Sequence, residues 1–171
     1  MKRLLHIGSY IAIAAVLVIA GVALTQRQNV VAGTNDNVSG WAWSGNAGWI
    51  SLNCTNTSSC GGVDYGVDIN PSNGEFSGRA WSPSIGWIEF DSSFSGPSGA
   101  HDSYGARLDI SAGTVSGWAR ALSFGAGWDG WISMSSGSGP NYGVTVSSSG
   151  SGGGYAWGGD VLGWIDFSLL Q

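Results

Sequence analysis

Two stretches decide the fold: Val38-Ser-Gly-Trp-Ala-Trp-Ser-Gly-Asn-Ala-Gly-Trp-Ile-Ser-Leu52 and Phe76-Ser-Gly-Arg-Ala-Trp-Ser-Pro-Ser-Ile-Gly-Trp-Ile-Glu-Phe90. Each contains two short runs in which small or aliphatic residues alternate with tryptophan or polar residues. A period of two, with aromatic and β-branched residues, is typical of β-strands. Each stretch therefore predicts an antiparallel hairpin, closed by a short glycine-containing loop.

Two further segments follow the same pattern. The third begins at Val115-Ser-Gly-Trp-Ala-Arg120 and resumes, after an insertion, at Gly130-Trp-Ile-Ser-Met134; the fourth is Gly154-Tyr-Ala-Trp157 followed by Gly163-Trp-Ile-Asp-Phe167. Self-similarity of this kind, at about 38 residues, indicates a repeat protein. Three of the four segments are preceded by one more short strand: Tyr65-Gly-Val-Asp-Ile69, Tyr104-Gly-Ala-Arg-Leu108 and Tyr142-Gly-Val-Thr-Val146.

The hairpin register can be predicted from the residues that it places opposite one another. If Trp43 faces Trp49, then Ala42 faces Ile50; the same register in the second segment sets Trp81 against Trp87 and Arg79 against Glu89. Opposite charges in a cross-strand pair support this choice. One face then carries alanine, isoleucine and other aliphatic residues, with the tyrosines and valines of the preceding strands, and forms the core. The other face carries the tryptophans.

The sequence thus predicts an all-β fold of four repeats, each an antiparallel three-stranded meander, after an N-terminal hydrophobic helix. The chain has thirty glycines and frequent Ser-Gly steps, and these leave little room for helix after residue 32. We expect the repeats to close as a prism-, sandwich- or propeller-like domain. The pattern does not distinguish these closures.

At these repeats the chain resembles an uncharacterised group of exported bacterial surface proteins. Their tandem Gly-x-Ala-Trp and Gly-Trp-Ile-x-Phe units are joined by Tyr-Gly-Val strands, and the resemblance covers about residues 38–167. It implies a surface location and little about chemistry.

The N-terminus has the composition of an export signal. Lys2 and Arg3 precede an uncharged stretch, residues 4–24, and the polar stretch that follows ends at Val30-Val31-Ala32. This pattern is typical of a secretory signal peptide. An uncleaved membrane anchor is the alternative, because twenty-one residues of helix just span a bilayer core of about 30 Å. Either way, residues 33–171 form an extracytoplasmic domain, whose membrane contact is limited to residues 4–24.

The charge and the cysteine content limit the classes of ligand that the domain can bind. After residue 32 the chain has three arginines, Arg79, Arg107 and Arg120, against all eleven acidic residues, which excludes the basic surface that nucleic acid requires. Cys54 and Cys60 flank a short polar loop and, in an oxidising compartment, predict a disulfide. Two sulfurs without a nearby histidine make a poor metal site. We expect neither a metal nor a cofactor.

The Trp-rich face is the candidate binding surface. Exposed aromatic side chains stack on sugar rings or anchor a protein partner, whereas the simpler interpretation is that cross-strand tryptophan pairs only stabilise the hairpins. The expected function is a non-catalytic surface or adhesion module that binds a cell-surface glycan or protein. The alternative is a structural envelope or filament component that self-associates through its Trp faces. The candidate binding residues are Trp43, Trp49, Trp81, Trp87, Trp118, Trp128, Trp131, Trp157 and Trp164.

No pair of acidic residues stands out as a catalytic couple, so we do not expect an enzyme. The eight acids considered occupy turns and polar strand positions: Asp68, Glu75, Glu89, Asp91, Asp109, Asp129, Asp160 and Asp166.

The third segment is irregular in two ways. Arg120 replaces the first tryptophan of the pair, and an apolar insertion with Leu122, Phe124 and Trp128 separates it from Trp131. Loops are usually polar, so this one either folds over the Trp face and caps one end of the repeats or projects as a binding tip.

Overall fold

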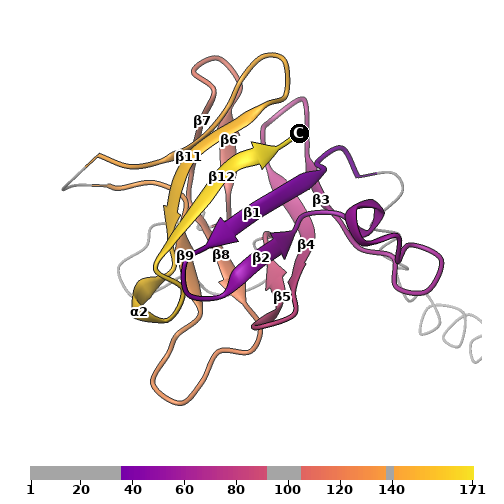
Figure 1. The fold of residues 1–171 in the computed structure, drawn as a ribbon. Helices are drawn as coiled ribbons and strands as arrows, with labels where there is room; N and C mark the ends of the chain where they lie inside the picture. Colours follow the sequence, from indigo (N-terminus) through magenta and orange to yellow (C-terminus); the bar gives the residue numbers. More distant parts are fainter. Residues whose placement is uncertain (1–35, 92–104, 138–140) are drawn as a thin grey trace, which may run out of the picture. The chain divides into compact units, whose positions relative to one another are not determined.

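The computed structural model describes residues 36–91, 105–137 and 141–171, and these form an all-β domain (Figure 1). Two short helical turns, η1 (Cys54–Thr57) and α2 (Gly159–Leu162), lie in loops. None of the helices in this part of the chain has the length and apolarity needed to cross a membrane. The expected N-terminal hydrophobic helix and the processing site at residue 32 lie outside the described residues. The strands are β1 (Gly40–Ser44), β2 (Gly48–Ser51), β3 (Val67–Ile69), β4 (Phe76–Ser82), β5 (Gly86–Glu89), β6 (Arg107–Asp109), β7 (Thr114–Ser116), β8 (Trp118–Ala121), β9 (Trp131–Ser133), β10 (Val144–Val146), β11 (Gly152–Trp157) and β12 (Trp164–Leu170).

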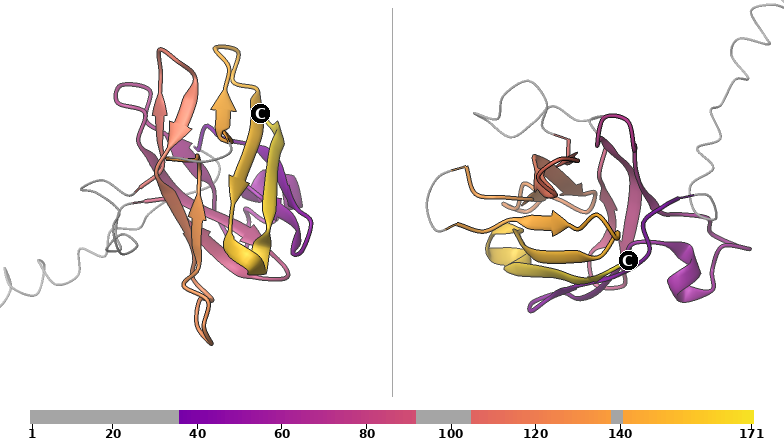
Figure 2. Two further views of the ribbon diagram at one scale, coloured as in Figure 1. Left: turned by 90° about the vertical axis from the view of Figure 1, so that its left-hand side faces the viewer. Right: turned by 90° about the horizontal axis from the view of Figure 1, so that it is seen from above.

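Eight of these strands close into an antiparallel barrel. They form four hairpins, β1–β2, β4–β5, β8–β9 and β11–β12, and the second strand of each hairpin pairs with the first strand of the next. Pairing of β12 with β1 closes the ring (Figures 1 and 2). The all-β, antiparallel prediction is confirmed. The closure is a barrel rather than a prism, sandwich or propeller, because every hairpin finds a neighbour on both sides and no sheet edge remains in the ring.

The hairpin register is the predicted one. Trp43 pairs with Trp49 and Ala42 with Ile50 in the first hairpin, and Arg79 pairs with Glu89 in the second. Between hairpins the pairing is offset by two residues, so that Ser51, rather than Trp49, lies opposite Trp81. Such a stagger between neighbouring strands is what a closed barrel requires.

The three short Tyr-Gly strands lengthen the barrel at one end. Each of β3, β6 and β10 pairs with the N-terminal part of the hairpin that follows it, through β4, β7 and β11 respectively. Each of these short strands therefore lies between the same two hairpins as β2, β5 or β9, but nearer to the end of the barrel. Between the fourth and the first hairpin, β12 takes the place of such a short strand. It continues to Leu170, whose Cα pairs with that of Gly40.

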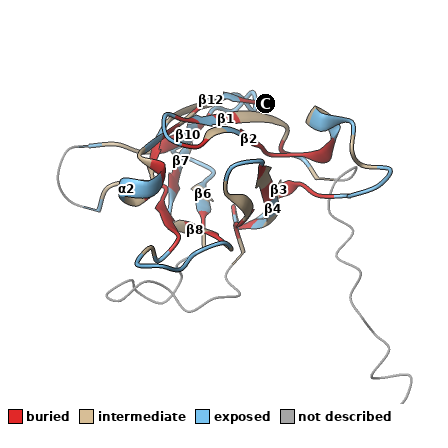
Figure 3. Cartoon of the chain, turned by 60° about the horizontal axis from the view of Figure 1, so that its bottom comes forward, coloured by how far each residue is buried: buried red, intermediate tan, exposed pale blue. Residues whose placement is uncertain are grey.

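The barrel interior is the hydrophobic core (Figure 3). The alternating residues predicted to face inward are buried, among them Ala42, Ile50, Ala80 and Ile88. The four hairpin loops also each contribute one apolar side chain to this core or to its margin: Ala47, Ile85, Trp128 and Leu162. The loops thus cover the end of the barrel opposite the short strands.

Candidate functional site

Because the barrel is closed, the face that carries the tryptophans is its outer surface. The tryptophans lie on the outside of the ring, one pair to a hairpin except in the third, so they form a belt around the barrel instead of one flat surface. Their exposure differs: Trp43, Trp49 and Trp164 are 42%, 46% and 47% exposed, whereas Trp81, Trp87, Trp118 and Trp157 are half-buried. The Trp-rich face predicted from the register is thus the outer surface of a closed barrel, and each hairpin has to be considered as its own site.

The fourth hairpin carries an open aromatic pocket, the Trp164 site. Asn141, Tyr142, Tyr155 and Trp164 line a cavity of about 370 Å³. The Tyr142 and Trp164 rings lie 4.9 Å apart at 78°, and the Tyr155 ring lies 6.5 Å from Trp164 at 77°. Tyr155 is half exposed, and Trp157 supports the other side of Trp164 at 4.8 Å. Two tyrosines thus stand nearly perpendicular to one accessible indole.

The second hairpin carries a similar pocket, the Trp87 site. It is lined by Thr57, Ser59, Val63, Tyr65, Trp81 and Trp87 and encloses about 280 Å³. Tyr65 lies against Trp87 with ring centroids 5.4 Å apart at 71°. The Tyr65 hydroxyl donates to Ser51 Oγ at 2.8 Å and lies 3.1 Å from Thr57 Oγ1, which fixes the ring.

A disulfide shapes one wall of the Trp87 site. Cys54 and Cys60 are bonded, as predicted, and close the loop that contains η1. Thr57 and Ser59 lie inside this loop, with their hydroxyl oxygens 2.8 Å apart. The loop therefore holds two hydroxyl groups at the edge of an otherwise aromatic pocket.

In the described part of the chain, the tryptophans of the first and third hairpins have other neighbours. No Tyr-Gly strand precedes the first hairpin in the sequence, and Trp49 packs against Trp43 and Trp41 at 4.7 and 5.9 Å instead. In the third hairpin the guanidinium of Arg120 lies 4.5 Å from the Trp131 ring, which is only 7% exposed. Tyr104, the tyrosine of this repeat, lies outside the described residues.

The insertion in the third hairpin combines the two expected arrangements. Gly125 and Trp128 exchange backbone hydrogen bonds around a turn at Ala126 and Gly127, so the loop is a small hairpin that projects beyond its neighbours (Figures 1 and 2). Phe124 stays exposed beneath Arg120. Trp128, however, packs on the core at the barrel end, so it belongs to the packing and not to the outer belt.

The tyrosines of the short strands also differ from the prediction. The sequence pattern placed them in the core, but neither belongs to the core cluster: Tyr65 is buried against Trp87, and the half-buried Tyr142 packs against Trp164. Alternation fails there because regular pairing begins only after each tyrosine, at β3 and β10. The signal that could have placed them is the recurrence of one tyrosine ahead of one tryptophan in each full repeat.

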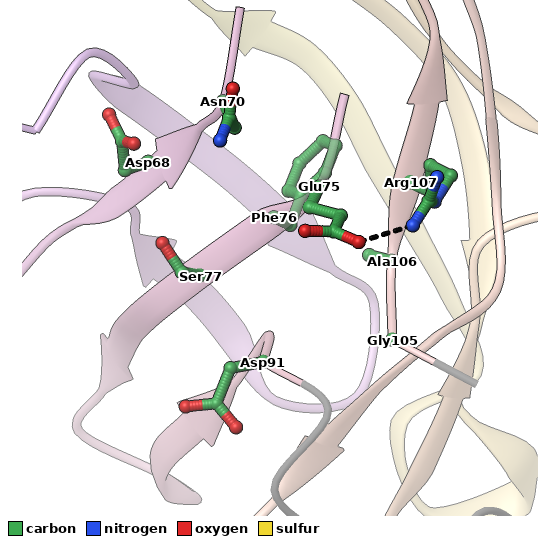
Figure 4. A pocket seen from close by; sticks show the side chains of 9 residues that line it. All are labelled: Asp68, Asn70, Glu75, Phe76, Ser77, Asp91, Gly105, Ala106 and Arg107. Atoms are coloured by element: carbon green, nitrogen blue, oxygen red, sulfur yellow. Dashed lines mark hydrogen bonds and ion pairs between the residues drawn. The ribbon is translucent and has the colours of Figure 1, made fainter. Parts of the chain in front are cut away.

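A polar cavity lies between the second and third hairpins (Figure 4). Asp68, Glu75 and Asp91 line it with Arg107, which forms an ion pair with Glu75. Its acidic side chains do not form a cluster of metal-binding type among the residues that the structure describes. Among the described residues, the one cluster of metal-binding type is Cys54, Cys60 and Asp64, and its sulfurs are consumed by the disulfide.

Beside this cavity, Glu89 is a buried acid on the outside of the barrel. Its carboxylate accepts from Arg79 Nε at 2.6 Å, and only 4% of the residue is exposed. Burial, followed by a hydrogen bond to Asp91, raises the pKa of Glu89 from 4.5 to about 7, although Arg79 acts in the opposite direction.

Comparison with protein-family models, with curated proteins and with solved structures finds no match to this chain.

Proposed function

We propose that this protein is a non-catalytic binding module that recognises a neutral glycan outside the cytoplasm. The observation that carries the proposal is the Trp164 site, where an accessible indole is flanked by Tyr142 and Tyr155 with the amide of Asn141 at its edge. Its volume of about 370 Å³ lies within the range of small-molecule sites.

The chemistry of this pocket fits a sugar ring. The C–H face of a pyranose is apolar and packs on an indole, while its hydroxyls need polar partners at the ring edge. Asn141 and the two tyrosine hydroxyls offer such donors and acceptors. The acidic balance of the domain disfavours anionic polysaccharides.

The extracytoplasmic setting rests on the export pattern of residues 1–32 and on the resemblance to exported bacterial surface proteins. The Cys54–Cys60 disulfide supports it, because disulfides persist in oxidising compartments.

The test compares Trp164→Ala with Trp49→Ala in the purified domain. Both indoles are nearly half exposed and lie in corresponding hairpin positions, but Trp49 has tryptophans in place of the tyrosines. We expect Trp164→Ala to weaken retention of the protein by neutral polysaccharides in affinity electrophoresis at least tenfold, and Trp49→Ala to leave it unchanged. Equal behaviour of the two variants, or no retention of the wild type on a broad glycan array, would refute the proposal.

A structural role is the second candidate, and the first hairpin favours it. Trp43 and Trp49 are the most exposed tryptophan pair and have no tyrosine to enclose a ligand. Adjacent exposed indoles are suited to contact with another copy of the chain. Sedimentation at increasing concentration distinguishes the two functions: assembly that Trp43→Ser abolishes supports the structural role, and a monomer at all concentrations excludes it.

A further inference from the structure

The Trp87 and Trp164 sites lie on opposite sides of the barrel. The ring order is β12-β1-β2-β4-β5-β8-β9-β11, and it returns to β12. Trp87 lies on β5 and Trp164 on β12, and these two strands are four places apart in either direction around the ring of eight. Figure 1 shows β12 and β5 on different sides of the domain.

The two sites are built in the same way. In each, the tyrosine of a Tyr-Gly-Val segment packs edge-on against the tryptophan that follows the glycine of the next hairpin loop. The ring separations are 5.4 and 4.9 Å and the interplanar angles 71° and 78°. A partner indole contacts each tryptophan: Trp81 lies 4.6 Å from Trp87 and also lines the pocket, and Trp157 lies 4.8 Å from Trp164.

We propose that the protein is bivalent, with the Trp87 site as a second glycan site, and that it cross-links separate polysaccharide chains. This inference rests on the proposed function, because it assigns to the Trp87 site the ligand class proposed for the Trp164 site. Thr57 and Ser59 there supply hydroxyl groups, where the other site has the amide of Asn141 and the hydroxyl of Tyr155.

Because the two sites lie on opposite sides of the barrel, we expect them to cross-link two polysaccharide chains and not to bind one polysaccharide chain more tightly. A single polysaccharide could occupy both sites only by following the outside of the barrel through half a turn. That path passes the first hairpin, where Trp49 and Trp43 project, or the third, where Phe124 projects. When geometry disfavours simultaneous engagement of one ligand, two sites bind two ligands and avidity toward one is lost.

Among the described residues, the contact of a Tyr-Gly tyrosine with a hairpin tryptophan occurs in the second and fourth hairpins, which gives a valence of two. In the third hairpin Arg120 lies over Trp131 instead, and the first has no Tyr-Gly strand. The two sites are therefore separated by half the ring.

The experiment measures stoichiometry and cross-linking separately. Calorimetric titration with a short neutral oligosaccharide identified on the array should give two sites for the wild type, one for Trp164→Ala, one for Trp87→Ala and none for the double variant. Turbidity on mixing with the corresponding long polysaccharide should appear with the wild type and disappear in either single variant. Trp49→Ala is the control and should retain both properties.

Because Trp87 is half-buried, its removal could unfold the hairpin. A second variant therefore tests the Trp87 site without removing this side chain. Val63 lines the mouth of the Trp87 site and is 52% exposed, so Val63→Arg blocks the site without removing core packing. One site in the wild type would overturn bivalency, and two sites in folded Val63→Arg and Trp87→Ala would overturn the assignment of the second site to Trp87; both outcomes leave the Trp164 site intact. No binding by the wild type at all would instead refute the proposed function.

Discussion

The Cα of Gly78 faces the backbone of Gly66 so closely that a Cβ on Gly78 would lie 2.2 Å from the Gly66 carbonyl oxygen. Gly78 has a φ of +82°, and the amide of the next residue, Arg79, donates to that same carbonyl at 2.7 Å. At this point β4 stops pairing with β3 and continues along β5. The same change of partner occurs at Gly154 in the fourth repeat, where β11 passes from β10 to β12. A glycine is needed at these two positions because the strand changes partners against a close backbone neighbour.

Gly78→Ala should therefore be severely destabilising. A positive φ costs an alanine about 1–2 kcal/mol, and the contact with a backbone oxygen adds to that cost. Gly86 is the matched control, because its φ is +75° but only the Trp81 ring lies near, at 4.0 Å. We expect a loss of about 1 kcal/mol for Gly86→Ala and at least 3 kcal/mol for Gly78→Ala in urea unfolding. Equal losses would show that the close approach is unimportant.

Trp128 should act as an apolar plug rather than as a binding residue. Its Nε1 is buried and, within the described part of the chain, has no hydrogen-bond partner. Trp128→Phe keeps most of the packing and removes the unsatisfied donor, so we expect a change below about 1 kcal/mol. Trp128→Ala should cost about 3 kcal/mol through the cavity that it leaves. Thermal unfolding of both variants, with glycan binding measured alongside, checks this; loss of binding in stable Trp128→Phe would contradict it.

The local pairing was predictable from sequence, and the closure was not. The opposition of Arg79 and Glu89, and of one tryptophan to another, selects a single register, and that register is present. Closure depends on the contact of β12 with β1, whose residues are more than a hundred positions apart and carry no complementary signature. The two pockets were missed for the same reason. Tyr65 and Tyr142 precede regular pairing, so period-two alternation says nothing about the side on which they lie.

Reduction of the disulfide should affect one binding site and spare the other. The Cys54–Cys60 loop forms the wall of the Trp87 site, whereas the Trp164 site has no residue from it. A Cys54→Ser, Cys60→Ser variant should lose about 2 kcal/mol of stability, since the closed loop is short. Titration with the oligosaccharide should then show one tight site in place of two. If both sites weaken equally, the effect is a general loss of stability and the assignment of this wall is wrong.

Glu89 should make the stability of the domain fall as the pH rises through neutrality. Its pKa is about 7 in the folded protein against an ordinary 4.5, so the folded state binds the proton more tightly than the unfolded state. The resulting stabilisation is fully present below about pH 4.5 and is lost as the pH rises to about 7. At about 1.4 kcal/mol per pKa unit, the loss approaches 3 kcal/mol.

Glu89→Gln removes this titration but keeps the side-chain volume and an oxygen acceptor for Arg79. The difference in unfolding free energy between wild type and Glu89→Gln, measured in urea from about pH 4 to pH 8, should therefore shift by about that amount in favour of the variant, because the contributions of titrating groups that do not interact with Glu89 cancel. Parallel profiles across this range would mean that Glu89 is not held protonated by its burial.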